Sequence, residues 1–245
     1  NSLLISRRQQ YHQRTAQMLE EASPELVEMH PELLAHHLAE AGLTERAVNY
    51  WLKAGERALA SYAYQEAITH FERGLIARNI VVSGTEAASD EDPVPDAEAA
   101  SALFGLGQAR ASTAEHFQMQ AAIACFTRAF DYYDKTGDVE RAVAVAEYPG
   151  HSLAAETGMD RIVVRVLALV RPDTLQAARL LSVHGAFLGR GDYPSAKNAL
   201  DRALAFSQRE RDTILEMRTL TRSANVAIFN LHYSDSIRLS ISPSG

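Results

Sequence analysis

A glycine followed closely by a helix-capping residue recurs at the junctions of this sequence. The stretches AGLTERA, TGDVERA, TGMDRIV and RGDYPSA each place a glycine where one helix is expected to end. In most of them the next helix is expected to begin at Thr44, Asp138, Asp160 or Asp192. Glycine tolerates the left-handed turn at a helix C-terminus, and Thr or Asp side chains accept hydrogen bonds from first-turn amides. Junctions this short join antiparallel helices, so they constrain the chain to a series of helical hairpins.

Apolar residues at three- and four-residue spacing continue through most of the chain between these junctions. Helix formers such as Ala, Leu, Glu, Arg and Gln fill the remaining positions, and no convincing alternating strand pattern is present. We therefore predict an all-α fold of antiparallel helical hairpins. The predicted helices span residues 6–22, 30–41, 44–61, 64–79, 97–112, 117–136, 138–148, 160–170, 174–190, 193–209 and 212–230, with the start of another at 234–241.

Composition and net charge indicate which partners and which cellular compartment this chain is suited to. Because 47% of the 245 residues are apolar, the chain can form a sizeable core. Its 31 acidic and 24 basic residues give a formal net charge of -7, which disfavours attraction to a phosphate backbone. The apolar runs are only a few residues long, and the beginning NSLLISRRQQ lacks the apolar core of a secretory signal. We expect a cytoplasmic protein that binds neither nucleic acid directly nor a membrane.

An internal repeat becomes visible when the junctions are aligned. The clearest copy, LLSVHGAFLGRGDYPSAKNALDRALAF, has its repeat positions at Leu180, Val183, Phe187, Gly191, Tyr193, Ala196, Leu200 and Ala203. A second copy consists of Leu34, Leu38, Gly42, Ala47, Trp51 and Ala54. These positions resemble the tetratricopeptide repeat, which implies helical hairpins stacked as a superhelical array. Small residues such as Ala196 leave room for a facing helix, while large ones such as Leu200 fill the adjoining groove.

The spacing of the copies is irregular. Ala47 and Ala67 are 20 residues apart (67 − 47), as are Ala122 and Ala142 (142 − 122). This spacing is shorter than a full repeat of about 34 residues. One long helix, such as 44–61, must then serve as the second helix of one hairpin and the first of the next. The match is to a divergent tetratricopeptide-like array.

The first third of the chain has a narrower resemblance. The sequence SRRQQYHQRTAQMLEE, followed by PELLAHHLAEAGLTERAVNYWLKAGERAL, is similar to the segment after the ATPase core of bacterial STAND-type signal-transduction ATPases. These include LuxR-type transcription regulators and multidomain class III adenylate or guanylate cyclases. The resemblance implies an ATPase and a winged-helix region upstream, and an array that senses a protein, a peptide or a small inducer. Because the chain begins with Asn and ends at SISPSG, we expect it to be part of a longer protein.

One acidic stretch, VVSGTEAASDEDPVPDAEA, breaks the helical series. It has five acids from Glu86 to Asp96, no basic residue and two prolines, which cannot continue a helix. We interpret about 80–96 as a flexible, solvated loop; an acidic docking site for a basic partner is the alternative. The predicted segments are a linker helix at 1–29, the first hairpins at 30–79, the acidic loop at 80–96 and further, truncated hairpins at 97–245.

Motifs of catalysis and cofactor binding are missing from the sequence. It contains no G-x-x-x-x-G-K-[ST] loop and no H-E-x-x-H, C-x-x-C or G-x-S-x-G motif. GLGQAR begins like a dinucleotide fingerprint but has Arg110 at the third glycine position, so Gly107 is expected to allow close helix contact instead. The single cysteine, Cys125, is predicted to be a small buried residue rather than a reactive thiol. We predict no catalytic residue, no cofactor and no metal site.

Two adjacent histidines and two carboxylates nevertheless make PELLAHHLAE a candidate site. Glu32, His36 and Glu40 share one helix face at four-residue spacing, whereas His37 lies about 100° away from His36. In the repeat register their face points into the concave groove. We interpret it as a hydrogen-bonded, solvated face or as a partner-binding surface. A metal or acid–base site is the third possibility, although adjacent histidines are a poor bidentate arrangement.

The most economical function is a non-catalytic interaction module that regulates an attached signalling ATPase. Two alternatives remain: an oligomerisation scaffold that pairs through its last hairpin, and an enzyme fragment that uses the face of His36 and Glu40. Aromatic residues at helical spacing are predicted to belong to the repeat core rather than to a ligand-stacking cage. They are Tyr50, Trp51, Tyr62, Tyr64 and Phe71.

Overall fold

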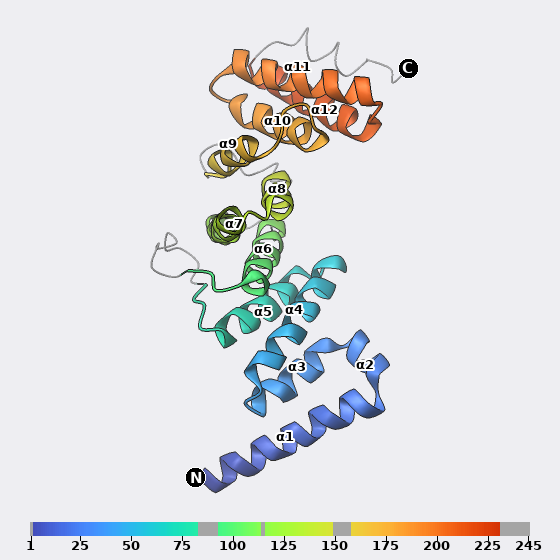
Figure 1. The fold of residues 1–245 in the computed structure, drawn as a ribbon, viewed down its shortest axis with the longest axis vertical. Coiled ribbons are helices and arrows are strands. Elements are labelled where there is room, and N and C mark those ends of the chain that lie inside the picture. The colour runs from blue at the N-terminus through green and yellow to red at the C-terminus, as the bar shows by residue number, and fades with distance from the viewer. Residues whose placement is uncertain (1, 83–92, 114–115, 149–157, 231–245) are drawn as a thin grey trace. The chain divides into compact units, whose positions relative to one another are not determined.

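All regular secondary structure that the computed structural model describes is helical (Figure 1). The described residues are 2–82, 93–113, 116–148 and 158–230. The all-α prediction is therefore confirmed for these ranges. The helices are α1 (Ser2–Ala22), α2 (Pro24–Met29), α3 (Pro31–Glu40), α4 (Thr44–Ala60), α5 (Tyr64–Ala77), α6 (Ala97–Ser112), α7 (His116–Thr136), α8 (Val139–Glu147), α9 (Met159–Leu169), α10 (Leu175–Leu188), α11 (Tyr193–Glu210) and α12 (Thr213–Phe229).

The chain forms two compact units, residues 1–133 and residues 134–245, which we call unit 1 and unit 2. The boundary falls inside α7, so the last residues of that helix belong to unit 2. The four segments that we expect from the sequence are not tested by this division and remain a prediction.

Successive helices pack against each other in unit 1. α3 contacts α1 and α4, α5 contacts α4 and α6, and α4 also contacts α6 directly. Phe71 of α5 is 1% exposed, and its ring lies against glycines of two neighbouring helices. A Cβ atom placed on Gly55 of α4 or Gly105 of α6 would come within 2.7 Å or 2.3 Å of this ring. The predicted close contact at Gly107 is also confirmed, since a Cβ atom there would lie 2.6 Å from Phe126.

Unit 2 has the same two kinds of contact. Sequence neighbours α8 to α12 pack in order, and α10 also contacts the alternate helices α8 and α12. Ala196 and Leu200 of α11 and Val226 of α12 are buried together in its core. A Cβ atom on Gly185 of α10 would lie 2.6 Å from Leu200, so a small residue on α10 faces a large one on α11.

Helix caps follow the predicted chemistry at some junctions and depart from it at others. The carboxylates of Asp138 and Asp192 accept hydrogen bonds from first-turn amides of α8 and α11, as predicted. Thr44 is not a cap, because Leu43 occupies the N-cap position of α4 and makes no side-chain capping bond. The prediction that Asp160 caps a helix is also wrong, because Gly158 is the N-cap of α9 and Asp160 lies in the first turn.

The boundaries of the predicted helices agree with the structure to within about two residues, except that α1 starts at Ser2 rather than at residue 6. The short helix α2 was not predicted. Tyr62 corrects the core assignment, because it is 77% exposed, with a positive φ of 62°, between α4 and α5. Trp51 and Phe71 are buried as predicted. The helix start expected at 234–241 lies outside the described residues.

The acidic segment differs from the predicted solvated loop at both of its ends. Ile80 is 3% exposed, and the carbonyl of Val82 accepts a hydrogen bond of 3.1 Å from Arg110. At the other end Asp96 caps α6 through the amide of Ala99 and pairs with Arg78. These contacts attach both ends of the segment to unit 1, while residues 83–92 lie outside the described residues.

Candidate functional site

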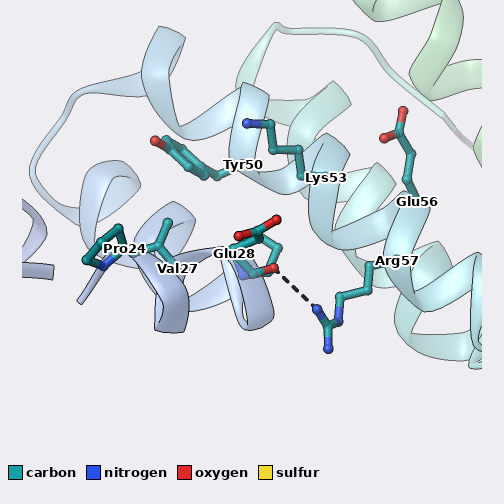
Figure 2. Close-up of a pocket in the computed structure, with 8 residues that line it drawn as sticks. Pro24, Val27, Glu28, Tyr50, Lys53, Glu56 and Arg57 are labelled. Atoms are coloured by element: carbon teal, nitrogen blue, oxygen red, sulfur yellow. Dashed lines mark hydrogen bonds between the residues drawn. The ribbon is translucent and has the colours of Figure 1, made fainter. Parts of the chain in front are cut away.

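Unit 1 has a groove between α2 and α4 (Figure 2). Its volume is about 620 Å³. One wall is α2, and the other is the outer face of α4, from Tyr50 to Arg57. The lining side chains are both apolar and charged: Pro24, Val27, Glu28, Pro31, Tyr50, Lys53, Glu56 and Arg57.

Two prolines produce this groove. Pro24 and Pro31 stand in the first turns of α2 and α3, where a missing amide hydrogen costs nothing and the fixed φ favours a helix. His30 lies between them and is at once the C-cap of α2 and the N-cap of α3. The chain therefore turns sharply after the six residues of α2, and α2 becomes a wall opposite α4 rather than a continuation of α1.

The polar groups of the groove leave its cations accessible. Arg57 donates a hydrogen bond of 3.3 Å to the backbone carbonyl of Glu28, which connects the two walls (Figure 2). The Nζ atom of Lys53 lies 5.3 Å from the centre of the Tyr50 ring, a cation–π contact in which the ammonium stays exposed. The Tyr50 hydroxyl donates to Glu20 at 3.4 Å. Burial, and then the negative charge of Glu20, raise the pKa of Tyr50, so its phenol remains protonated and uncharged at neutral pH.

The three residues of the predicted face each contact a different group. Glu40 forms an ion pair of 2.8 Å with Arg8 of α1. The ring of His36 lies edge-on to that of His12, also on α1, with centroids 5.8 Å apart. Glu32, at the start of α3, contacts Nδ1 of His30 at 3.0 Å. Since α1 packs against α3, two of the three side chains, those of His36 and Glu40, contact residues of α1.

The shortest histidine contact joins His37, which the sequence places off the candidate face, to His12, which the sequence did not single out. The Nδ1 atoms of His12 and His37 are 2.9 Å apart, and their ring centroids are 5.1 Å apart. Burial lowers the pKa of His37, and the neighbouring His12 and His36 lower it further. A signal was available: Arg8, His12 and Ala16 follow one another at four-residue spacing and so share the face of α1 that contacts α3.

Cys125 is buried as predicted, with 3% of its surface exposed. The Nη1 atom of Arg110 lies 3.5 Å from its sulfur, and Arg110 also forms an ion pair of 2.9 Å with Glu72. Burial raises the pKa of the thiol, which is therefore protonated at neutral pH. The contacts of Arg110 connect α5, α6 and α7, which indicates a structural role for this buried group.

Among the described residues, no three His, Cys, Asp or Glu side chains are grouped so that they could hold a metal ion. None of the helices in those ranges combines the length and the apolar character needed to cross a bilayer. The chain matches no protein-family model, and no curated protein or solved structure is significantly similar to it. Its function has to be inferred from the groove and the charged surfaces themselves.

Proposed function

We propose that this chain is a non-catalytic, tetratricopeptide-like interaction module whose groove between α2 and α4 binds a peptide segment of a partner protein. The observation that carries the proposal is the lining of that groove. Pro24, Val27 and Tyr50 offer apolar contact, while Lys53 and Arg57 place two cations along one wall. Peptide-binding surfaces of stacked helices combine such apolar contact with a few fixed polar groups.

The partner segment needs an apolar side chain and a carboxylate close to each other. An apolar side chain fits between Val27 and Tyr50, and a carboxylate reaches the exposed ammonium of Lys53. Glu28 and Glu56 flank the same groove and disfavour a uniformly acidic segment. This combination favours an amphipathic peptide of mixed charge.

The resemblance of the first third to STAND-type ATPases supports a wider proposal. In that context the module is a cytoplasmic sensor or scaffold that controls an ATPase in the same protein, and the output is a transcription regulator or a nucleotide cyclase. The packing of α1 against α3 is compatible with this role, because it holds α1, the predicted linker helix, in contact with the first predicted hairpin. A partner in the nearby groove could then alter the attachment of α1.

A small inducer is the second candidate occupant of the groove. The volume of the groove, about 620 Å³, lies within the usual range of small-molecule sites, about 300–1,000 Å³. Lys53, Glu56 and Arg57 in the lining are exposed residues, which favours a peptide over an enclosed ligand.

Selection of peptides from a displayed random library against the chain, followed by fluorescence anisotropy titration, tests the proposal. Lys53→Glu should weaken the binding of selected peptides by about tenfold, because it reverses the charge at the centre of the groove. Lys135→Glu is the matched control, since Lys135 is an exposed lysine in unit 2. If the selected peptides bind both variants with equal affinity, the groove is not their binding site. ATP turnover by the chain alone would refute the non-catalytic assignment.

A further inference from the structure

We infer that unit 2 carries a second binding surface, in which Arg179, Arg218 and Arg222 receive an acidic peptide segment of a partner protein. The surface lies on α8, α10 and α12, of which α10 contacts both α8 and α12. It is separate from the groove of unit 1 and does not depend on the function proposed for that groove.

The charges of all three arginines act on one carboxylate, that of Glu147. The Nη1 atom of Arg179 on α10 lies 3.8 Å from Oε2 of Glu147, at the end of α8. Arg218 and Arg222 follow one another at one-turn spacing on α12, so they share a helix face, and the charges of both act on Glu147. Three positive charges and one negative charge therefore meet in a chain whose formal net charge is -7.

A buried polar contact holds Arg222 in place. Its Nη1 atom donates a hydrogen bond of 2.9 Å to the hydroxyl of Ser182 on α10. That hydroxyl also contacts the hydroxyl of Thr219 at 2.9 Å, and both residues are 0% exposed. The guanidinium is thus positioned before any ligand arrives, which reduces the entropy lost on binding.

The charges of this cluster are not balanced within the described residues. Burial, and then the nearby Arg218, lower the pKa of Arg222, so its positive charge lies in an unfavourable environment. Glu147 compensates only one of the three cations, and its Oε1 atom is buried with no hydrogen-bond partner there. Arg218 forms no ion pair or hydrogen bond with any described residue. An additional carboxylate at this position would relieve the repulsion between Arg218 and Arg222.

The exposure of the cluster favours a peptide over a single small anion. Arg179 is 45% exposed and Arg218 is exposed, so water and salt screen each charge pair. An isolated anion would make only such screened contacts. Several acidic side chains on one extended segment can reach the arginines of α10 and α12 together, and their contributions add through the shared chain.

Fluorescence anisotropy with a labelled oligoglutamate peptide, titrated with the whole chain at low ionic strength, tests this assignment. We expect binding that weakens with added salt and no binding of an oligolysine peptide. Arg179→Gln combined with Arg218→Gln should raise the dissociation constant about fivefold. Arg218→Lys should retain most of the affinity. Arg202→Gln is the matched control, because Arg202 is an exposed arginine on α11 of the same unit.

Four results would overturn the assignment. Three are absence of oligoglutamate binding, equal affinity of the double variant and the wild type, and an equal loss in Arg202→Gln. The fourth is displacement of the peptide by inorganic phosphate but not by sodium chloride of the same ionic strength, which would indicate a small phosphate ligand instead. Thermal denaturation of each variant shows whether unit 2 is folded. Lys53→Glu should leave oligoglutamate binding unchanged, so failure of this surface and failure of the groove are distinguishable.

Discussion

The Nδ1 atoms of His12 and His37 lie 2.9 Å apart and join α1 to α3. At that distance one nitrogen must donate a hydrogen and the other must accept it, so the contact requires at least one neutral ring. His36 lies within 5.8 Å of His12 and within 5.4 Å of His37, measured between ring centroids. The ion pair between Arg8 and Glu40 lies between the same two helices. The packing of the first helix on the array therefore depends on the protonation of histidines.

The stability of unit 1 should consequently decrease in mild acid. The pKa of His37 is lower in the folded state than its ordinary value of 6.5, so the folded protein binds fewer protons than the unfolded one. This contribution to stability is complete above about pH 6.5 and is lost as the pH falls from there towards the lowered pKa. Thermal denaturation at about pH 7.5 and about pH 5.5 should give a lower midpoint at the acidic pH.

His37→Gln is the informative variant for this prediction. Its midpoint should depend less on pH than that of the wild type. Some dependence remains in the variant, because burial also lowers the pKa of His70 and His184. An unchanged pH dependence in His37→Gln would show that the histidine contact does not support the α1–α3 packing.

Gly105→Ala should destabilise unit 1, although alanine is the better helix former. The new Cβ atom would lie 2.3 Å from the ring of Phe71, which is also confined by Gly55. Overpacking costs about 1–3 kcal/mol and opposes a helix-propensity gain of about 1 kcal/mol, so we expect a net loss of up to about 2 kcal/mol. Urea denaturation followed by fluorescence measures it, because Trp51 of unit 1 is the single tryptophan.

Gly191→Ala is the control for the packing argument. A Cβ atom at Gly191 would meet nothing within 4 Å, and this glycine is not among those with a positive φ. The substitution should therefore be neutral or slightly stabilising. Equal effects of the two substitutions would contradict the close packing of Phe71.

Thr174→Ala and Thr44→Ala should differ although the substitution is the same. The Thr174 hydroxyl accepts a hydrogen bond of 3.2 Å from the amide of Ala177 and so caps α10. Its removal should cost about 1 kcal/mol. Thr44 is the first residue of α4 and makes no capping bond, so its replacement should leave the free energy of unfolding almost unchanged. Urea titrations followed by circular dichroism compare them; a larger loss at Thr44 would contradict the cap assignment.

The helices were largely predictable because their boundaries and caps depend on residues that are close together in the sequence. The apolar spacing in residues 97–112 predicts α6 with the boundaries that the structure has. Asp138 and Asp192 are the N-caps of α8 and α11, as their residue type and position predict. Short elements carry too little periodicity, which is why the six residues of α2 were missed. Thr44 has the expected residue type, but the helix begins one residue earlier than that cap requires.

The candidate sites were harder to predict because they join residues that are distant in the sequence. His12 and His37 are separated by 25 positions, and the two walls of the groove come from α2 and α4. The sequence pointed to Glu32, His36 and Glu40 because four-residue spacing is visible within one helix. It could not show that α1 covers part of that face, since the contact depends on tertiary packing. Whether this face binds a partner remains a prediction.

Hydrogen–deuterium exchange of the chain, with and without a saturating selected peptide, measures directly where the partner segment binds. If the groove is the binding site, amide exchange should slow in α2 and in residues 50–57 of α4, while α11 should be unaffected. Protection restricted to unit 2, or to the part of α3 from Glu32 to Glu40, with no change in α2 or α4, would contradict the proposed function.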